Sequence, residues 1–157
     1  MDEILLLTNG PGELSTWVPP VVRRLRERLP GARLELFLIA DQFASGQERQ
    51  KARELPLDVV GERRELLARL VSRARKGKGL VLMLGGAPRD AVLLARATGY
   101  PAFSYSFNGS NWHPRLHRFL VDSERTRAEA LRRGADPARL QVVGNLVLDA
   151  IAETHLS

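Results

Sequence analysis

The 157-residue sequence contains no cysteine and only three histidines, and 6% of its residues are aromatic. Without cysteine there is no disulfide, no thiolate nucleophile and no Cys-ligated zinc site, and three scattered histidines argue against a His-rich metal site. No apolar run approaches the roughly 20 residues that a membrane-spanning helix needs, and Met1-Asp2-Glu3 is unlike the basic start of a signal peptide. We therefore expect a soluble, cytoplasmic protein that uses no metal and no other cofactor.

The positive charge is carried almost entirely by arginine, with 21 arginines against 3 lysines and a formal net charge of +6. The planar guanidinium group suits phosphate and carboxylate partners, which include nucleic acid, anionic lipid and phosphorylated substrates. Most of the arginines stand beside glutamates at helical spacing, and there are few aromatic residues for base stacking. The two richest stretches, Arg23–Arg33 and Arg63–Lys78, are themselves interrupted by glutamates. A salt-bridged helix surface is therefore favoured, and nucleic acid is not an expected partner.

Short apolar runs alternate with helical patterns along the whole chain. The first unit is a strand at Ile4–Thr8, a glycine turn, a helix capped by Ser15 or Thr16, and a strand at Leu34–Ala40. The other predicted strands are Leu57–Val60, Leu80–Leu84, Ala102–Tyr105, Phe119–Val121 and Leu140–Val143, and the other predicted helices are Ser45–Glu54, Glu62–Arg75, Arg89–Ala97, Glu124–Arg133 and one from Leu146. This alternation predicts an α/β fold in which one domain, residues 1–157, forms a doubly wound, Rossmann-like parallel sheet.

Ligand sites in such sheets lie in the loops that follow the carboxyl ends of the strands. The loop after the first predicted strand reads Asn9-Gly10-Pro11-Gly12-Glu13. Its glycines let backbone amides approach a ligand, and the start of a helix favours an anion. The loop lacks the third glycine of the dinucleotide fingerprint and the lysine of a Walker loop. A tight turn in which Glu13 stabilises the helix dipole is supported equally well.

Two further loops are predicted at the same edge of the sheet. Gly85 and Gly86 form a second glycine turn, followed by Arg89 and Asp90 at the start of a helix. The third loop, Phe107–Pro114, carries amide, hydroxyl and indole groups of the kind that bind sugars, among them Asn108, Asn111 and Trp112. Each feature also has a structural interpretation, as a turn or as a tryptophan that covers the core. No nucleophile motif of a hydrolase is present, so Glu13 is the candidate proton acceptor if a reaction occurs.

Three separated stretches of the chain carry a shared pattern. The first is Gly12-Glu13 together with the following helical segment Pro20–Pro30. The second is Ala87-Pro88 with Ser104–Trp112, and the third is Val121–Asp136 with Val142–Asp149. Together they resemble the amino-terminal half of GT-B glycosyltransferases, nearest to the lipid A disaccharide synthase and Kdo transferase families. The last stretch, with Val-x-Gly-Asn-x-x-x-Asp at Val142–Asp149, is the most specific of the three. The resemblance spans nearly the whole chain.

The resemblance implies an acceptor-side domain that binds a lipid-linked or envelope sugar for transfer from a nucleotide sugar. The donor would bind mainly to a second, carboxyl-terminal domain, which we expect to be absent from this chain because it ends at Ser157. The resemblance assigns the catalytic base to Glu13. Together, the loops and the resemblance give the candidate substrate-binding residues Asn9, Gly10, Gly12, Gly85, Gly86, Arg89, Asp90, Asn108, Asn111, Trp112 and Asn145. In the disaccharide synthases a carboxylate follows the Ala-Pro pair, whereas this chain has Arg89 there and Asp90 one place later.

A second interpretation remains open, in which the chain is a non-catalytic glycan- or anion-binding module that acts with a partner subunit. Whichever interpretation holds, capping of the last helix is the favoured local role of Asn145. A lipid acceptor would also bring the protein to the inner face of the membrane as a peripheral protein. Trp17, Val18 and Arg23-Arg24 are the candidate anchors, although Trp17 and Val18 fit the core better.

Overall fold

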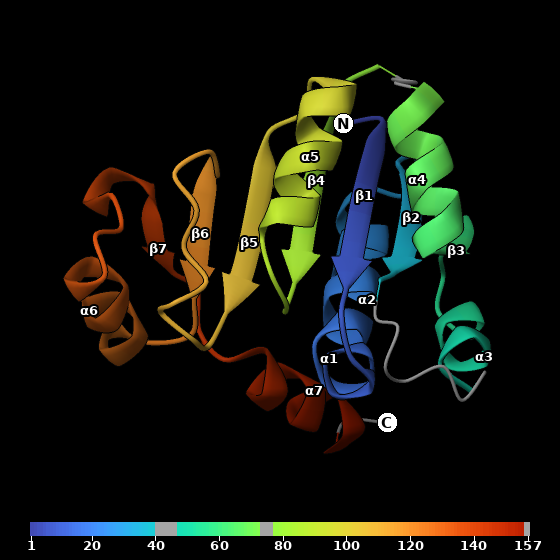
Figure 1. Ribbon diagram of the computed structural model, residues 1–157. Helices are drawn as coiled ribbons and strands as arrows, with labels where there is room; N and C mark the ends of the chain where they lie inside the picture. The colour runs from blue at the N-terminus through green and yellow to red at the C-terminus, as the bar shows by residue number, and fades with distance from the viewer. Residues whose placement is uncertain (40–46, 73–76, 156–157) are drawn as a thin grey trace.

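The computed structural model describes residues 1–39, 47–72 and 77–155, which form one α/β domain around a seven-stranded sheet (Figure 1). The strand order is β3-β2-β1-β4-β5-β6-β7, and every neighbouring pair is parallel. The strands are β1 (Glu3–Thr8), β2 (Arg33–Leu38), β3 (Val59–Glu62), β4 (Gly79–Leu84), β5 (Ala102–Ser106), β6 (Arg118–Val121) and β7 (Leu140–Val142). The predicted doubly wound, Rossmann-like sheet is confirmed.

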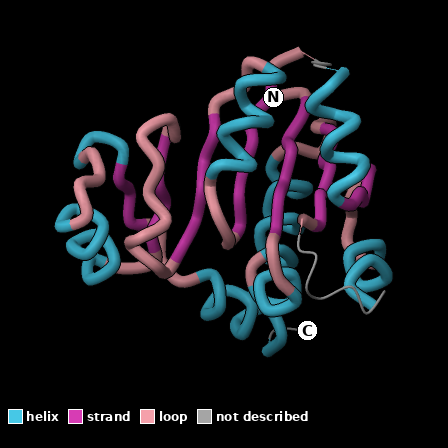
Figure 2. The backbone as a smooth tube through the Cα atoms, viewed as in Figure 1, coloured by secondary structure: helices cyan, strands magenta, loops and turns pink. Residues whose placement is uncertain are grey.

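Helices cover both faces of the sheet (Figure 2). They are α1 (Pro11–Thr16), α2 (Val18–Arg28), α3 (Gln47–Arg53), α4 (Arg63–Ser72), α5 (Arg89–Thr98), α6 (Glu124–Arg132) and α7 (Leu146–His155), with a 3₁₀ turn η1 at Pro137–Arg139. Leu5 and Leu7 of β1 belong to the core beneath α4 and α5, whereas Ile4 and Leu6 belong to the core with α1 and α2. Because both faces of β1 are covered, the strand is buried along its whole length.

The first helix differs from its predicted start. It begins at Pro11 after Gly10, and neither Ser15 nor Thr16 caps it. Pro11 suits the first helical position because its missing N–H would have no partner there. The helix is interrupted at Trp17, since Pro19 and Pro20 have no N–H to continue the hydrogen bonding of α1; they are accommodated in the first turn of α2.

The third strand lies two residues later than the sequence predicts, at Val59–Glu62. Leu57 and Asp58 instead form the approach to the strand, where the Asp58 carboxylate accepts a hydrogen bond from the Leu34 N–H at 2.7 Å. That N–H and the Arg26 guanidinium, 2.9 Å from the carboxylate, hold the pKa of Asp58 below its usual value. The predicted positions 40, 45–46 and 73–75 lie outside the described residues.

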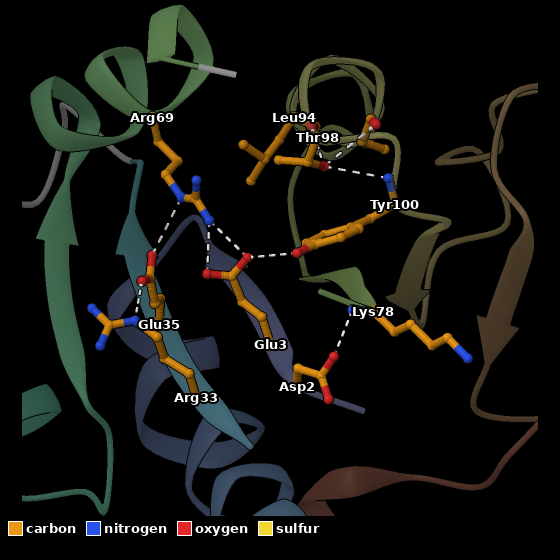
Figure 3. Close-up of polar contacts among 10 residues, drawn as sticks. Asp2, Glu3, Arg33, Glu35, Arg69, Lys78, Leu94, Thr98 and Tyr100 are labelled. Carbon is orange, nitrogen blue, oxygen red and sulfur yellow. Dashed lines mark hydrogen bonds and ion pairs between the residues drawn. The ribbon is translucent and has the colours of Figure 1, made fainter. Parts of the chain in front are cut away.

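The amino edge of the sheet contains a buried ionic network that links strands to helices (Figure 3). Glu3 of β1 is fully buried, and both of its carboxylate oxygens lie 2.7 Å from an Arg69 nitrogen of α4. The Tyr100 hydroxyl, after α5, donates to the same carboxylate at 2.9 Å. Arg69 also lies 3.7 Å from Glu35 of β2, which pairs with Arg33 at 2.6 Å. Arg69 therefore holds α4 against β1 and β2.

Within the described residues, no helix is both long and apolar enough to span a membrane.

We expect Arg69→Met to destabilise the domain strongly. Removing one member of a buried ion pair leaves the other charge uncompensated, which costs about 3–5 kcal/mol. Urea unfolding of the variant measures the loss, and Arg64→Met, at an exposed position on the same helix, is the control. Adding Glu3→Gln to Arg69→Met removes the unpaired Glu3 charge and should recover part of the lost free energy of unfolding. A cost for Arg69→Met no larger than that of the control contradicts a stabilising role for the network.

Candidate functional site

The strand order reverses between β1 and β4. From β1 the chain passes to α1 and α2 on one face, and from β4 it passes to α5 on the other face. The loops after these two strands therefore diverge and leave a crevice at the carboxyl edge, the usual ligand position in this class of fold. The Thr8 hydroxyl at the end of β1 donates to the Leu84 carbonyl at the end of β4, at 3.2 Å, and so joins the strands directly below the crevice.

The two glycine loops contact each other across this crevice, as predicted for a shared cleft. Gly85 and Gly86 have φ angles of 83° and 80°, a left-handed conformation that favours glycine. A Cβ atom on Gly85 would lie 2.6 Å from Cγ of Glu13, and one on Gly86 would lie 2.6 Å from Cβ of Asn9. Only residues without a side chain allow the second loop to approach the first this closely.

Glu13 is the carboxylate at the centre of this contact. It lies in the first turn of α1, partly buried, with its side chain against Gly10 and Gly85. Its backbone carbonyl accepts from the Trp17 N–H, but within residues 1–39, 47–72 and 77–155 its side chain accepts no hydrogen bond and forms no ion pair. Its oxygens are thus available to a ligand, on the same edge of the sheet as Gly86.

The third loop joins the other two through Asn111. The Asn111 side-chain amide donates to the Gly86 carbonyl at 3.2 Å and to the Ser106 hydroxyl at 3.4 Å. Asn108 shapes the loop itself, because its side-chain oxygen accepts a hydrogen bond from the Ser110 N–H at 3.0 Å. All three predicted loops therefore lie at one edge, and the Gly85-Gly86 turn contacts both of the others.

A hollow of about 500 Å³ opens beside Glu13. It is lined by Gly12, Glu13, Thr16, Trp17, Phe107, Asp122, Asn145 and Val147. The structure thus brings Gly12, Glu13 and Asn145 together, as a common site requires. Asp122 is not among the residues predicted for the site, although its position directly after β6 is the signal that identified the other loops.

An aromatic group supports the wall of this hollow. The Trp17 ring meets the rings of Tyr105 and Phe107 edge to face, at centroid distances of 5.0 and 5.4 Å. The Tyr105 hydroxyl donates to the Gly144 carbonyl and accepts from the Leu146 N–H, both at 3.2 Å. Burial raises the pKa of Tyr105 above its usual value, although the Leu146 N–H opposes the shift. The hydroxyl therefore stays protonated and keeps the start of α7 at the hollow.

Asn145 has a structural role as well as a place in the hollow. Its side-chain oxygen accepts a hydrogen bond from the Val147 N–H at 2.9 Å, which is the geometry of a helix cap. The capping role considered from the sequence is therefore present, and the side chain still faces the hollow that Glu13 lines.

Arg89, Asp90, Asn108 and Trp112 are among the predicted site residues that do not line the Glu13 hollow. Arg89 and Asp90 form the first turn of α5, and the structure gives neither side chain a hydrogen bond or ion pair within its described part. Asn108 lines a neighbouring hollow of about 580 Å³, which shares Phe107 and Asp122 with the first. Trp112 packs against Phe119 of the core, with ring centroids 6.2 Å apart. Their roles in substrate binding stay predictions.

Two of the suggested membrane anchors belong to the interior. Trp17 is 5% exposed and Val18 is fully buried, so neither side chain is available to a lipid surface, whereas Arg23 and Arg24 are exposed. In the described ranges no three His, Asp or Glu side chains gather in a way that could hold a metal ion.

The fold has counterparts among solved structures. A crystal structure of a "putative UDP-N-acetylglucosamine 2-epimerase" from Listeria monocytogenes matches 98% of this chain, with a TM-score of 0.61 and 14% identity. This chain spans 47% of that protein, about half its length. The cypemycin decarboxylase CypD is similar over 97% of this chain and 90% of its own, with a TM-score of 0.48 and 12% identity. No family model and no curated protein matches the sequence. The likeness to the epimerase establishes the fold alone, a GT-B-like Rossmann domain.

The contact between the two glycine loops can be tested by Gly85→Ala with Gly134→Ala as its control. Both glycines have nearly the same φ, 83° and 85°, but a Cβ on Gly134 meets nothing within 4 Å. Each variant should lose about 1–2 kcal/mol for its left-handed backbone. Gly85→Ala should lose roughly 1–3 kcal/mol more through overpacking against Glu13, as measured by urea unfolding.

Glu13→Ala removes the atoms that collide with the new methyl group. The extra loss should therefore disappear when Gly85→Ala is made in a Glu13→Ala background. Equal costs for Gly85→Ala and Gly134→Ala would show that the Glu13 side chain does not rest on Gly85.

Proposed function

We propose that this chain is the acceptor-binding half of a GT-B glycosyltransferase, resembling lipid A disaccharide synthase and the Kdo transferases, in which Glu13 is the catalytic base. The observation that carries the proposal is the Glu13 carboxylate, which lies at the reversal of the strand order without a protein partner in the described residues and faces a hollow large enough for a sugar. The GT-B-like fold is consistent with this function but does not select it.

The proposed reaction forms one glycosidic bond. The acceptor hydroxyl oxygen attacks the anomeric carbon of the donor sugar, its proton passes to the Glu13 carboxylate, and the bond from the anomeric carbon to the nucleoside diphosphate breaks. A carboxylate within hydrogen-bond reach of the hydroxyl typically contributes a factor of about 10²–10⁴ to such a step. Backbone amides and cations can stabilise the departing diphosphate without a metal ion.

The walls of the hollow suit a sugar acceptor. Phe107 is 62% exposed and offers an aromatic face for the C–H side of a sugar ring. Asp122 and Asn145 supply oxygen and amide groups that can bind hydroxyls. Arg89 and Asp90 lie outside this hollow, so the proposal does not depend on the carboxylate that the disaccharide synthases carry after their Ala-Pro pair.

Exposed apolar side chains on and just before α7, the helix whose Val147 lines the hollow, support the second domain that the proposal needs. Leu148 and Ile151 of α7 are 64% and 48% exposed, and Val143 before α7 is 44% exposed. Val147 of the same helix lines the hollow together with Phe107. A nucleotide-sugar domain, in the same chain or in a partner subunit, would cover them and bring the donor to Glu13. The lipid-linked acceptor and a location at the inner membrane face belong to the same proposal.

A non-catalytic glycan-binding module is the second candidate. The capping bond from the Val147 N–H to Asn145 favours it, because this residue would be needed in the absence of any reaction. Glu13 can likewise serve the dipole of α1 without accepting a proton. The two candidates share the acceptor site and differ only in the role of Glu13.

Glu13→Gln should separate them. In a transfer assay of the chain together with its nucleotide-sugar domain, we expect kcat to fall by about 10²–10⁴ while KM for the acceptor stays within a few fold, because the amide keeps the shape but cannot take the proton. Glu27→Gln, at an exposed position on α2, is the matched control and should leave kcat unchanged.

Thermal unfolding of both variants belongs in the same experiment. A Glu13→Gln protein that is less stable but transfers sugar at the parent rate would assign Glu13 to the helix dipole. A parent protein that binds an acceptor sugar in calorimetry but forms no product, with its second domain present, would favour the binding module.

A further inference from the structure

A third hollow, of about 540 Å³, is lined by residues at and before the starts of β5 and β6. These strands begin at the edge of the sheet opposite to α1 and the first glycine loop (Figure 1). Four arginines line the hollow from four segments: Arg96 from α5, Arg115 from the loop before β6, Arg118 from β6 and Arg139 from η1. No aspartate or glutamate lines it, whereas the hollows at the carboxyl edge contain Glu13, Asp122 or Glu129. This hollow is separate from the proposed acceptor site.

Most other arginines of the described chain are paired with acids. Examples are Arg24 with Glu27, Arg26 with Asp58, Arg33 with Glu35, and Arg132 and Arg133 with Glu129. In the arginine hollow, the structure gives the side chains of Arg96 and Arg115 no hydrogen bond and no ion pair with any described residue. Arg139 alone has an acidic partner there, Asp136 at 3.4 Å. The hollow therefore carries positive charge that the protein does not balance.

Two of the guanidinium groups are held in place by carbonyl oxygens. Arg139 donates through Nη1 to the carbonyls of Pro114 and Leu116, at 2.8 and 2.9 Å. Arg118 donates through Nη1 to the carbonyl of Ala138 at 3.0 Å. Each group keeps further N–H donors for a ligand. A fixed guanidinium fork loses little freedom when it binds an anion, and it matches the geometry of phosphate oxygens.

We propose that this arginine hollow binds the phosphate or diphosphate group of a small organic molecule. The apolar side chains of Val92, Ala95 and Pro101 form part of its wall and would contact the organic portion. The volume is within the usual range for small-molecule sites. No exposed large apolar side chain of the described residues lines the hollow, so it offers nothing to insert into a lipid bilayer. A concave site with fixed donors favours a small anion over a flat membrane surface.

Pyrophosphate is the probe that tests the proposal. We expect the chain to bind it in isothermal titration calorimetry at low ionic strength. Arg96→Gln with Arg115→Gln should weaken binding at least about tenfold, since each substitution removes charge-assisted hydrogen bonds to the phosphate oxygens. Because neither side chain has a protein partner in the structure, the melting temperature of this double variant should match that of the parent.

Arg28→Gln with Arg53→Gln is the matched control, because it removes the same charge from exposed positions on α2 and α3. Equal weakening in both double variants would show a net-charge effect and overturn the site. Absence of pyrophosphate binding by the parent at millimolar concentration would overturn it too. Vesicles of phosphatidylcholine with phosphatidic acid form the second arm: retention on these vesicles without pyrophosphate binding would assign the arginines to a membrane and reject the small-molecule site.

Discussion

The parallel pairing of β1 with both β2 and β4 is the constraint on which the rest of the structure depends. Leu6 of β1 stands opposite Leu36 on one side and Leu82 on the other, and both faces of β1 are buried. The chain leaves β1 toward α1 and α2 on one face of the sheet and leaves β4 toward α5 on the other face, so the loops that follow β1 and β4 must diverge. The crevice with Glu13 is thus a consequence of strand order, and the glycines at 85 and 86 set how closely its two loops approach.

The buried ionic network at the amino edge keeps this pairing in register. A buried ion pair adds little net stability compared with apolar packing, but a charged group without its partner is costly, so alternative registers are disfavoured. Gly79 contributes through its lack of a side chain, since a Cβ atom there would lie 2.6 Å from Cζ of Tyr100. The Tyr100 ring occupies that space and its hydroxyl reaches Glu3. Placing α4 over β1 and β2 on one face leaves α1 and α2 to cover the other.

Local patterns in the sequence were sufficient for the order and kind of the elements but not for the contacts between them. Alternating apolar runs and glycine turns identified every strand of the sheet, and three loops were placed at the correct edge. The start of α1 was mistaken because Ser15 and Thr16 are good caps in isolation, whereas Pro11 fits the first turn immediately after Gly10. Arg69 could not be matched to Glu3, 66 residues away, because such a pairing depends on helix placement. Asp122 was missed for the same reason, as its neighbours in the hollow come from other segments.

A sheet in which every strand is parallel has two chemically different edges, and this chain uses the difference. The carboxyl edge contains the glycine loops and the carboxylates Glu13 and Asp122, which suit a neutral, hydroxyl-rich ligand. The amino edge beside β5 and β6 contains arginines that are held by carbonyl oxygens or have no partner among the described residues, which suits an anion. The arginines of this chain therefore differ in whether an acidic side chain balances their charge. Many arginines pair with acids, whereas the four that line the arginine hollow have one acidic partner between them and leave a net positive charge there, on the edge that the proposed transfer reaction does not use.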